Sequence, residues 1–199
     1  MFFFNKPSDE FIRQYISTHA DDPFNYLEVG ASAEENAPNG YNLDHNRIRL
    51  GKGRDIFNKA KAALRSWKMF DLVWIDLCWP NTPIETGSVV GILARHLGFW
   101  SLNMTRIIYV IQMDNGIERY GFGYGTLTNH AERGEERFLI EYDPEDDSVS
   151  YDLYAFSRPN HLMARLAYPF SRMLQKRFAV ESLKRLAAAV DEAKVSNYE

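Results

Sequence analysis

Residues 120–138, "YGFGYGTLTNHAERGEERF", carry the pattern on which the fold assignment depends. Three glycines alternate there with aromatic residues: Gly121, Gly123 and Gly125. A period of two is that of a β-strand, so the glycines lie on one face and the aromatic side chains on the other. A face without side chains lets a helix or another backbone approach closely. The stretch therefore predicts a strand at 119–127 followed by a hairpin connection, and it lacks the glycine spacing of a dinucleotide-binding loop.

Hydrophobic periodicity places further elements on both sides of this strand. Six other strands are predicted at 47–50, 70–77, 88–97, 103–113, 136–142 and 148–157. Helices are predicted at 8–20, at 54–67 and from Asn160 to about residue 193. Within the last helix, Pro169 is expected to cause a kink or a break between two helices.

The order of these elements predicts the fold class. One strand, a helix, six consecutive strands and a long C-terminal helix indicate an α+β fold with an antiparallel meander. A curved sheet of about seven strands must bury its concave face, and the long amphipathic helix is the element large enough to cover it. We therefore expect a helix-grip arrangement, with a cavity between sheet and helix if the lining residues are not all large.

The length of 199 residues suits one domain with a short additional arm. Residues 30–40, "GASAEENAPNG", are small and polar, which is typical of a linker. We predict that residues 1–40 form an N-terminal helical arm and linker and that residues 41–199 form the main domain. The aromatic content of 14% predicts that large side chains fill a core or line a cavity.

Charge and composition argue against several classes of protein. A net charge of −4 argues against a nucleic-acid-binding face, which needs concentrated basic residues. The sequence has neither the run of about 18 apolar residues typical of a membrane span nor the apolar core of a signal peptide. The single cysteine, Cys78, cannot form an internal disulfide. We therefore expect a cytoplasmic protein without stable membrane insertion, and its oligomeric state stays open.

Four long segments resemble a known family. They are "YNLDHNRIRLGKGRDIFNKAKAALRSWKMFDL" (41–72), "ARHLGFWSLNMTRIIYVI" (94–111), "YGFGYGTLTNHAERGEERF" (120–138) and "YDLYAFSRPNHLMARLAYPFSRMLQKRF" (151–178). These segments are similar to domain-of-unknown-function family 1990, found in bacteria and plants, over about residues 41 to 190. The resemblance implies the START-like, birch-pollen-allergen-like helix-grip superfamily. Members of that superfamily hold lipids, sterols or polyketides between sheet and helix, and some are cyclases or hydrolases; the resemblance assigns no catalytic residue.

Motifs for cofactors and metals are incomplete. Gly51-Lys52-Gly53 precedes a helix, but a P-loop needs serine or threonine after its lysine, so we interpret it as a tight turn. The five histidines lack the spacing typical of metal ligands, and the acidic stretch 143–147 lacks the glycine and glutamate of an EF-hand. Cys78 ends an apolar strand with nothing nearby to lower its pKa, which indicates an inert thiol. We predict no cofactor and no metal site.

Charged side chains inside alternating strands are the candidates for a site. Burying an ionised group is unfavourable unless it is paired, and an ion pair between Arg106 and Glu136 is the favoured pairing. In the functional interpretation, six side chains bind the polar end of a ligand: His96, Arg106, Tyr109, Tyr124, Glu136 and Arg158. In the structural interpretation, these groups buttress the sheet or reach solvent at strand ends.

Three functions stay open at this point. The first is a binding protein that holds a hydrophobic or amphipathic small molecule between sheet and helix. The second is an enzyme of cyclase or hydrolase type, with Glu136 or His96 as general acid or base. The third is a protein-interaction module with a filled core, in which residues 1–40 contact a partner.

Overall fold

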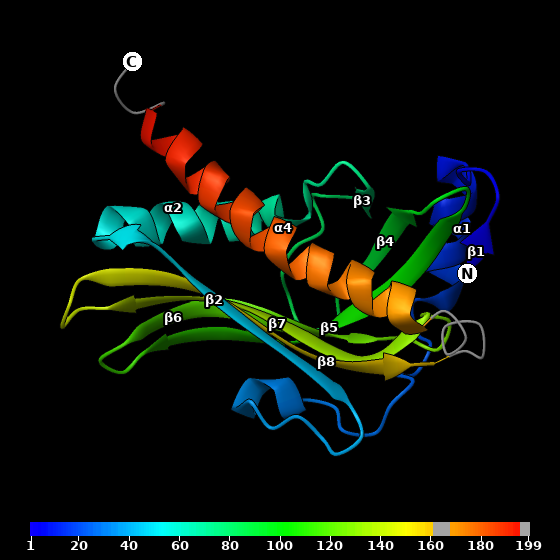
Figure 1. Cartoon of the computed structure of the whole chain (residues 1–199), viewed down its shortest axis with the longest axis horizontal. Coiled ribbons are helices and arrows are strands. Elements are labelled where there is room, and N and C mark those ends of the chain that lie inside the picture. The colour runs from blue at the N-terminus through cyan, green and yellow to red at the C-terminus, as the bar shows by residue number, and fades with distance from the viewer. Residues whose placement is uncertain (161–167, 196–199) are drawn as a thin grey trace.

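The computed structural model describes residues 1–160 and 168–195 and contains one antiparallel sheet with helices on both faces (Figure 1). Its strands are β1 (Phe2–Phe3), β2 (Asn42–Lys52), β3 (Ile75–Cys78), β4 (Val89–Arg95), β5 (Trp100–Asp114), β6 (Glu118–Thr126), β7 (Glu132–Asp143) and β8 (Ser148–Pro159). Its helices are α1 (Asp9–His19), α2 (Arg54–Arg65) and α4 (Tyr168–Val195), with 3-10 helices η1 (Ala31–Glu34) and η2 (Lys68–Phe70).

The strand order of the sheet is β2-β8-β7-β6-β5-β4-β3, and β1 pairs with the start of β5. Strands β3 to β8 therefore form a meander, and β2 joins its far edge beside β8. Helices α4 and α2 lie on one face of the curved sheet, which is its concave face, while η1 lies on the opposite, convex face (Figure 1). The predicted α+β class and helix-grip arrangement are confirmed.

Local sequence explains where the first helices begin. Ser8 caps α1 by accepting a hydrogen bond from the Phe11 amide at 3.2 Å, and the buried face of α1 includes Ile12 and Tyr15. Before α2, Gly53 adopts φ +92° and its amide donates to the Asp147 carbonyl at 2.9 Å. The Gly53 amide therefore already has a partner, which agrees with the tight-turn interpretation of the Gly-Lys-Gly stretch.

Several predicted boundaries differ from the structure, including the starts of β2 and β7, which are earlier than expected. The strand expected at 70–77 begins only at Ile75, because Trp67 takes a left-handed φ of 54° and residues 68–70 form η2. The helix predicted from Asn160 is described from Tyr168 onward, and residues 161–167 lie outside the described residues. Pro169 occupies the first turn of α4, where a helix does not need its missing N–H, so the described helix is not interrupted there.

The alternating glycines of β6 lie on the convex face. A Cβ at Gly123 would overlap the ring of Tyr109, and a Cβ at Gly125 would overlap the hydroxyl of Tyr26. The predicted close approach is confirmed. Aromatic side chains from β5 and from the segment before β2 make it at Gly123 and Gly125, and the backbone of β7 makes it at Gly121. We call residues 24–41 the cover segment, because they lie over this face of the sheet.

Hydrophobic clusters fill both sides of the sheet among the described residues. The largest lies on the concave face, where the rings of Trp67 and Phe122 are 5.0 Å apart. A second joins α1 to the convex face of β5 through Ile12 and Met104, and a third lies beneath the cover segment around Tyr154. Because both faces of the sheet are buried, the alternation of apolar residues along a strand does not show which of its faces points to α4.

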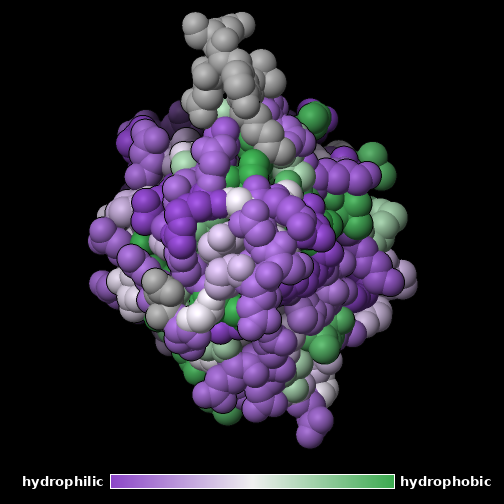
Figure 2. All heavy atoms as spheres, turned by 90° about the vertical axis from the view of Figure 1, so that its left-hand side faces the viewer, coloured by the Kyte–Doolittle hydropathy of each residue, from purple (hydrophilic) through white to green (hydrophobic). Residues whose placement is uncertain are grey.

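The outer surface differs from one end to the other. Figure 2 shows the end that carries the β5–β6 and β7–β8 turns, and hydrophilic side chains predominate on it. In the described part of the chain, no helix combines the length and the apolar character needed to cross a membrane.

Candidate functional site

A cavity of about 750 Å³ lies between the concave face of the sheet and α4. Its volume is in the range of small-molecule binding sites. Its apolar walls include Phe70, Trp74, Ile92, Leu153, Leu174 and Phe178. Space remains because several lining positions carry small side chains, including Ala94, Ala155 and Ala179.

The cavity extends to the end of the molecule where β1, the β4–β5 turn and the first turn of α4 meet. Apolar side chains are exposed there: Phe4 is 90% exposed and Leu97 is 88% exposed. Phe2 packs edge-on against Phe99 with ring centroids 5.9 Å apart, and all four residues line the cavity. Apolar side chains therefore surround the mouth of the cavity, whereas the opposite end of the molecule, shown in Figure 2, is mainly hydrophilic.

Tyr124 and Glu136 face each other across β6 and β7 inside the cavity. They are directly paired residues of the antiparallel ladder, and the Tyr124 hydroxyl donates to Glu136 Oε2 at 2.5 Å. Burial raises the pKa of Glu136 to about 7, while the tyrosine hydrogen bond opposes that shift. Burial and the neighbouring carboxyl together raise the pKa of Tyr124 well above its usual value. The pair can hold or release a proton near neutral pH through the carboxyl group.

A second group of polar side chains lies where α4 meets β2 and β7. Arg172 forms two hydrogen bonds with Asp44, at 2.6 and 2.7 Å, which neutralises that carboxylate. Glu132 also lines the cavity, and burial raises the pKa of its carboxyl group to about 7, although Ser171, Arg172 and Gln175 nearby oppose the shift.

His96 follows β4 directly and lines the cavity near its mouth. Its Nε2 atom is 2.7 Å from Ser101 Oγ, and Nδ1 is enclosed without a hydrogen-bond partner among the described residues. Burial lowers the pKa of this imidazole, so the neutral form is favoured at neutral pH.

The structure brings three of the six predicted site residues together on the cavity: His96, Tyr124 and Glu136. The other three lie on the convex face: Arg106, Tyr109 and Arg158. The Tyr109 hydroxyl is 2.7 Å from Ser32 Oγ in the cover segment. The guanidinium group of Arg158 stacks 4.3 Å from the ring centre of Tyr41, also in that segment.

The predicted ion pair between Arg106 and Glu136 was wrong. Arg106 donates to the backbone carbonyls of Ala20 and Asp22 at 2.5 and 2.8 Å and lies over the ring of Phe24. It shares a face with Met104, which packs against α1. That face of β5 is apolar because α1 covers it. The apolar alternation that placed Arg106 among buried residues therefore belongs to the convex face and not to the cavity.

Glu135, next to Glu136, points to the convex face and is 3% exposed. Its carboxylate accepts hydrogen bonds from the Tyr26 hydroxyl (2.8 Å), the Gly30 amide (2.5 Å), and the amide and hydroxyl of Ser32 (2.9 and 2.6 Å). All four donors belong to the cover segment. We call this arrangement the Glu135 clasp, and it holds the cover segment on the sheet.

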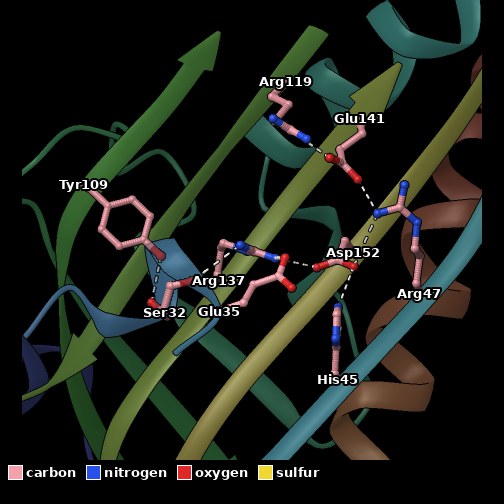
Figure 3. Close-up of polar contacts among 9 residues, drawn as sticks. All are labelled: Ser32, Glu35, His45, Arg47, Tyr109, Arg119, Arg137, Glu141 and Asp152. Atoms are coloured by element: carbon pink, nitrogen blue, oxygen red, sulfur yellow. Dashed lines mark hydrogen bonds and ion pairs between the residues drawn. The ribbon is translucent and has the colours of Figure 1, made fainter. Parts of the chain in front are cut away.

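A charged network lies beside the clasp (Figure 3). Arg137 donates to Asp152 Oδ1 at 2.9 Å and to Glu35 Oε1 at 2.7 Å, and Asp152 Oδ2 is 2.8 Å from His45 Nε2. Burial alone would lower the pKa of Arg137, but these carboxylates raise it above its usual value. Arg47 and Arg119 bond in turn to Glu141. The charges of this network therefore compensate one another.

Part of this network has donor atoms suited to a metal ion. Glu35, His45 and Asp152 place one ligand atom each within 4.8 Å of one another. Arg137 and Arg47 already bond to these carboxylates, at 2.7 to 3.5 Å, so a divalent cation would have to compete with two guanidinium groups. The arrangement favours a structural role. Its members lie too far apart in the sequence for a spacing motif to indicate them.

Cys78 lies at the end of β3 among the hydrophobic residues that pack with α1. Burial raises the pKa of its thiol to about 12. The thiolate is therefore scarce at neutral pH, in agreement with the interpretation of an inert cysteine.

These features define a class: an α+β helix-grip protein with an apolar cavity that carboxyl groups face. The chain matches the family described as Domain of unknown function (DUF1990) over residues 25–185, and it belongs to that family. The matched region begins at residue 25 and so includes nearly all of the cover segment. The sequence resemblance began only at about residue 41, where the cover segment ends.

Two relatives, both named UPF0548 protein, cover nearly the whole chain. The UPF0548 protein of Dictyostelium discoideum is 39% identical over an alignment of 207 positions that covers 96% of each chain. The UPF0548 protein of Deinococcus radiodurans is 34% identical over 199 residues, covering 95% of this chain and 98% of the relative.

Solved structures are similar at low identity. A norcoclaurine synthase point mutant from Thalictrum flavum has 9% identity and a TM-score of 0.47, covering 77% of this chain and 96% of that one. Major latex-like protein 151 from Panax ginseng has 11% identity and a TM-score of 0.42, covering 74% and 96%.

Proposed function

We propose that this protein binds a hydrophobic or amphipathic small molecule in the cavity between the sheet and α4. The cavity itself, about 750 Å³ with mostly apolar walls, is the observation that carries the proposal. Burying the apolar part of a ligand there removes it from water, at roughly 25 cal/mol per Å². The few polar groups, Glu136 and Tyr124 deepest among the strands and His96 near the mouth, would orient its polar part.

The apolar rim supports an entry route at the same end. Phe4 and Leu97 expose large side chains to solvent beside the mouth, where a hydrophobic ligand would first make contact. A filled core, which the interaction-module alternative requires, is disfavoured by a cavity of this volume.

Binding of the neutral dye Nile red, followed by fluorescence titration, tests the proposal. In the double variant Ala155→Trp/Leu174→Trp, two indole rings occupy the cavity, and we expect dye binding at least about tenfold weaker than in the wild type. The matched control is Met173→Trp/Val180→Trp, which places two indoles on the exposed side of α4 and should bind like the wild type. Equal binding by both double variants, or no binding by the wild type, would refute the proposal.

The Tyr124–Glu136 pair favours a second candidate, an enzyme that uses the same cavity. A carboxyl group with a pKa of about 7 is suited to general acid–base catalysis at neutral pH. Mass spectrometry of compounds that co-purify from the native cells would supply the substrate to test. Glu136→Gln should then still bind this compound at saturation but abolish its conversion; unchanged conversion would exclude the role.

A further inference from the structure

The charge on the cavity wall restricts which amphipathic molecules the site accepts. Among the described residues that line the cavity there is no lysine and no arginine. Arg172, which lies close by, is committed to Asp44 through two hydrogen bonds. Burial favours neutral His96, so this imidazole does not supply a positive charge at neutral pH. An anionic group entering the cavity would therefore lose its hydration without gaining a lysine or arginine partner among the described lining residues, whose other basic side chains are His96 and His130.

Carboxyl groups, in contrast, face the same space. Glu132 and Glu136 both line the cavity, four residues apart on β7 and on the same face of that strand. Tyr124 donates one hydrogen bond to Glu136, and the described residues supply no second donor to that carboxyl group. Ser171 and Gln175 are hydrogen-bonding neighbours of Glu132, but a carboxylate has about four acceptor sites, so both carboxylates keep acceptor capacity for a ligand.

An ammonium group fits this arrangement. It carries only donors and a positive charge, so it can bond to a carboxylate that has unused lone pairs, and such charge-assisted hydrogen bonds are about twice as strong as neutral ones. The burial that makes ionised Glu132 and Glu136 unfavourable in the empty cavity is offset in part once a cation binds beside them, whereas a second anion would add to the cost. A neutral alcohol gains only the weaker bond.

We propose that the cavity selects apolar molecules that carry a basic nitrogen, protonated in water, over fatty acids and other anionic amphiphiles. This inference rests on the proposed binding function and names the chemical class of its ligand. The hydrocarbon or aromatic body lies against Phe70, Trp74 and Phe178, and the ammonium group bonds to Glu136 or Glu132.

Three probes with the same alkyl chain test the inference: decylamine, decanol and decanoate. Isothermal titration at pH 8, where both glutamates are largely ionised, should give a dissociation constant for decylamine at least about tenfold below that for decanoate, with decanol between them. Loss of decylamine binding in Ala155→Trp/Leu174→Trp would place the bound amine in the cavity, and retained binding in that variant would contradict the inference.

Variants of the carboxyl groups provide the second arm. Glu136→Gln and Glu132→Gln should each reduce the ratio of decylamine to decanol affinity by about threefold to tenfold, whereas Glu145→Gln, in the exposed β7–β8 turn, should leave it unchanged. Taking the ratio within one variant removes the effect of any unfolded fraction. If neither cavity variant changes the ratio, the assignment is wrong. If wild-type protein prefers decanoate, the amine class is wrong and the binding function stands; if all three probes and Nile red fail to bind, the binding function itself is wrong.

Discussion

Glu135 and Glu136 are neighbours in β7, but their carboxyl groups lie in opposite environments. Glu135 points to the convex face and accepts four hydrogen bonds from the cover segment. Glu136 points to the cavity, where Tyr124 is the donor that the described residues provide. On the convex face, the Glu135 carboxylate therefore holds the cover segment on the sheet. On the concave face, the Glu136 carboxyl group keeps acceptor sites without a donor from the described residues. Incompletely bonded groups in a cavity are the ones available to a ligand.

The largest expected effect comes from the convex network. Asp152→Ala leaves the buried guanidinium of Arg137 without its buried partner, and breaking a buried pair in this way costs about 3–5 kcal/mol of unfolding free energy. Guanidinium chloride unfolding would measure it. The control is Asp76→Ala, which removes half of the exposed pair with Lys6 and should cost less than about 1 kcal/mol. Similar losses in the two variants would contradict the contrast between buried and exposed pairs.

Breaking the clasp should have the next largest effect. Glu135→Gln keeps the shape but replaces an acceptor oxygen by an amide that donates, so at least one donor of the cover segment is left unpaired, at about 2 kcal/mol. Hydrogen exchange at the amides of Gly30 and Ser32 should accelerate. A variant with unchanged exchange there would show that the cover segment is held mainly by its aromatic contacts.

The corresponding substitution at the next position, Glu136→Gln, should stabilise the protein above neutral pH. The pKa of Glu136 is raised by burial, so the native state binds more protons than the unfolded state. The free energy of unfolding of the wild type therefore falls as pH rises from 4.5 to about 7. Glu136→Gln should equal the wild type near pH 4.5 and exceed it by about 1–2 kcal/mol at pH 8. Urea unfolding at both pH values, with Glu145→Gln as control, measures the difference; a less stable variant at pH 8 would refute it.

The smallest effect is expected at the rim of the convex network. Glu35 bonds to Arg137 but its side chain is 51% exposed, so water can replace it. Glu35→Ala should therefore cost less than about 1 kcal/mol, in contrast to Asp152→Ala on the same guanidinium group. Denaturant midpoints of the two variants give the comparison directly.

Sequence patterns predicted the fold well because strand and helix periods are local. The period-two glycines of 121–125 and the order of the strands are confirmed. The late start of β3 was missed, because left-handed Trp67 and η2 depend on packing of Phe70 in the core and not on local preference.

The site was only half predictable, for a physical reason. Alternation separates the two faces of a strand but does not say which of them meets the cavity, and here both faces are buried. Of the predicted side chains, Glu136 and Tyr124 face the cavity, whereas Arg106 does not, because α1 packs on its face of β5 and makes that face apolar. The Glu135 clasp was missed because its partners lie more than a hundred positions away.

That separation also has a kinetic consequence. The clasp joins residues 103 to 109 positions apart, so the loop between them must close before its hydrogen bonds can form. If the clasp forms after the folding transition state, its loss changes the rate of unfolding more than the rate of folding. The cover segment then lengthens the lifetime of the folded state without changing how fast that state is reached.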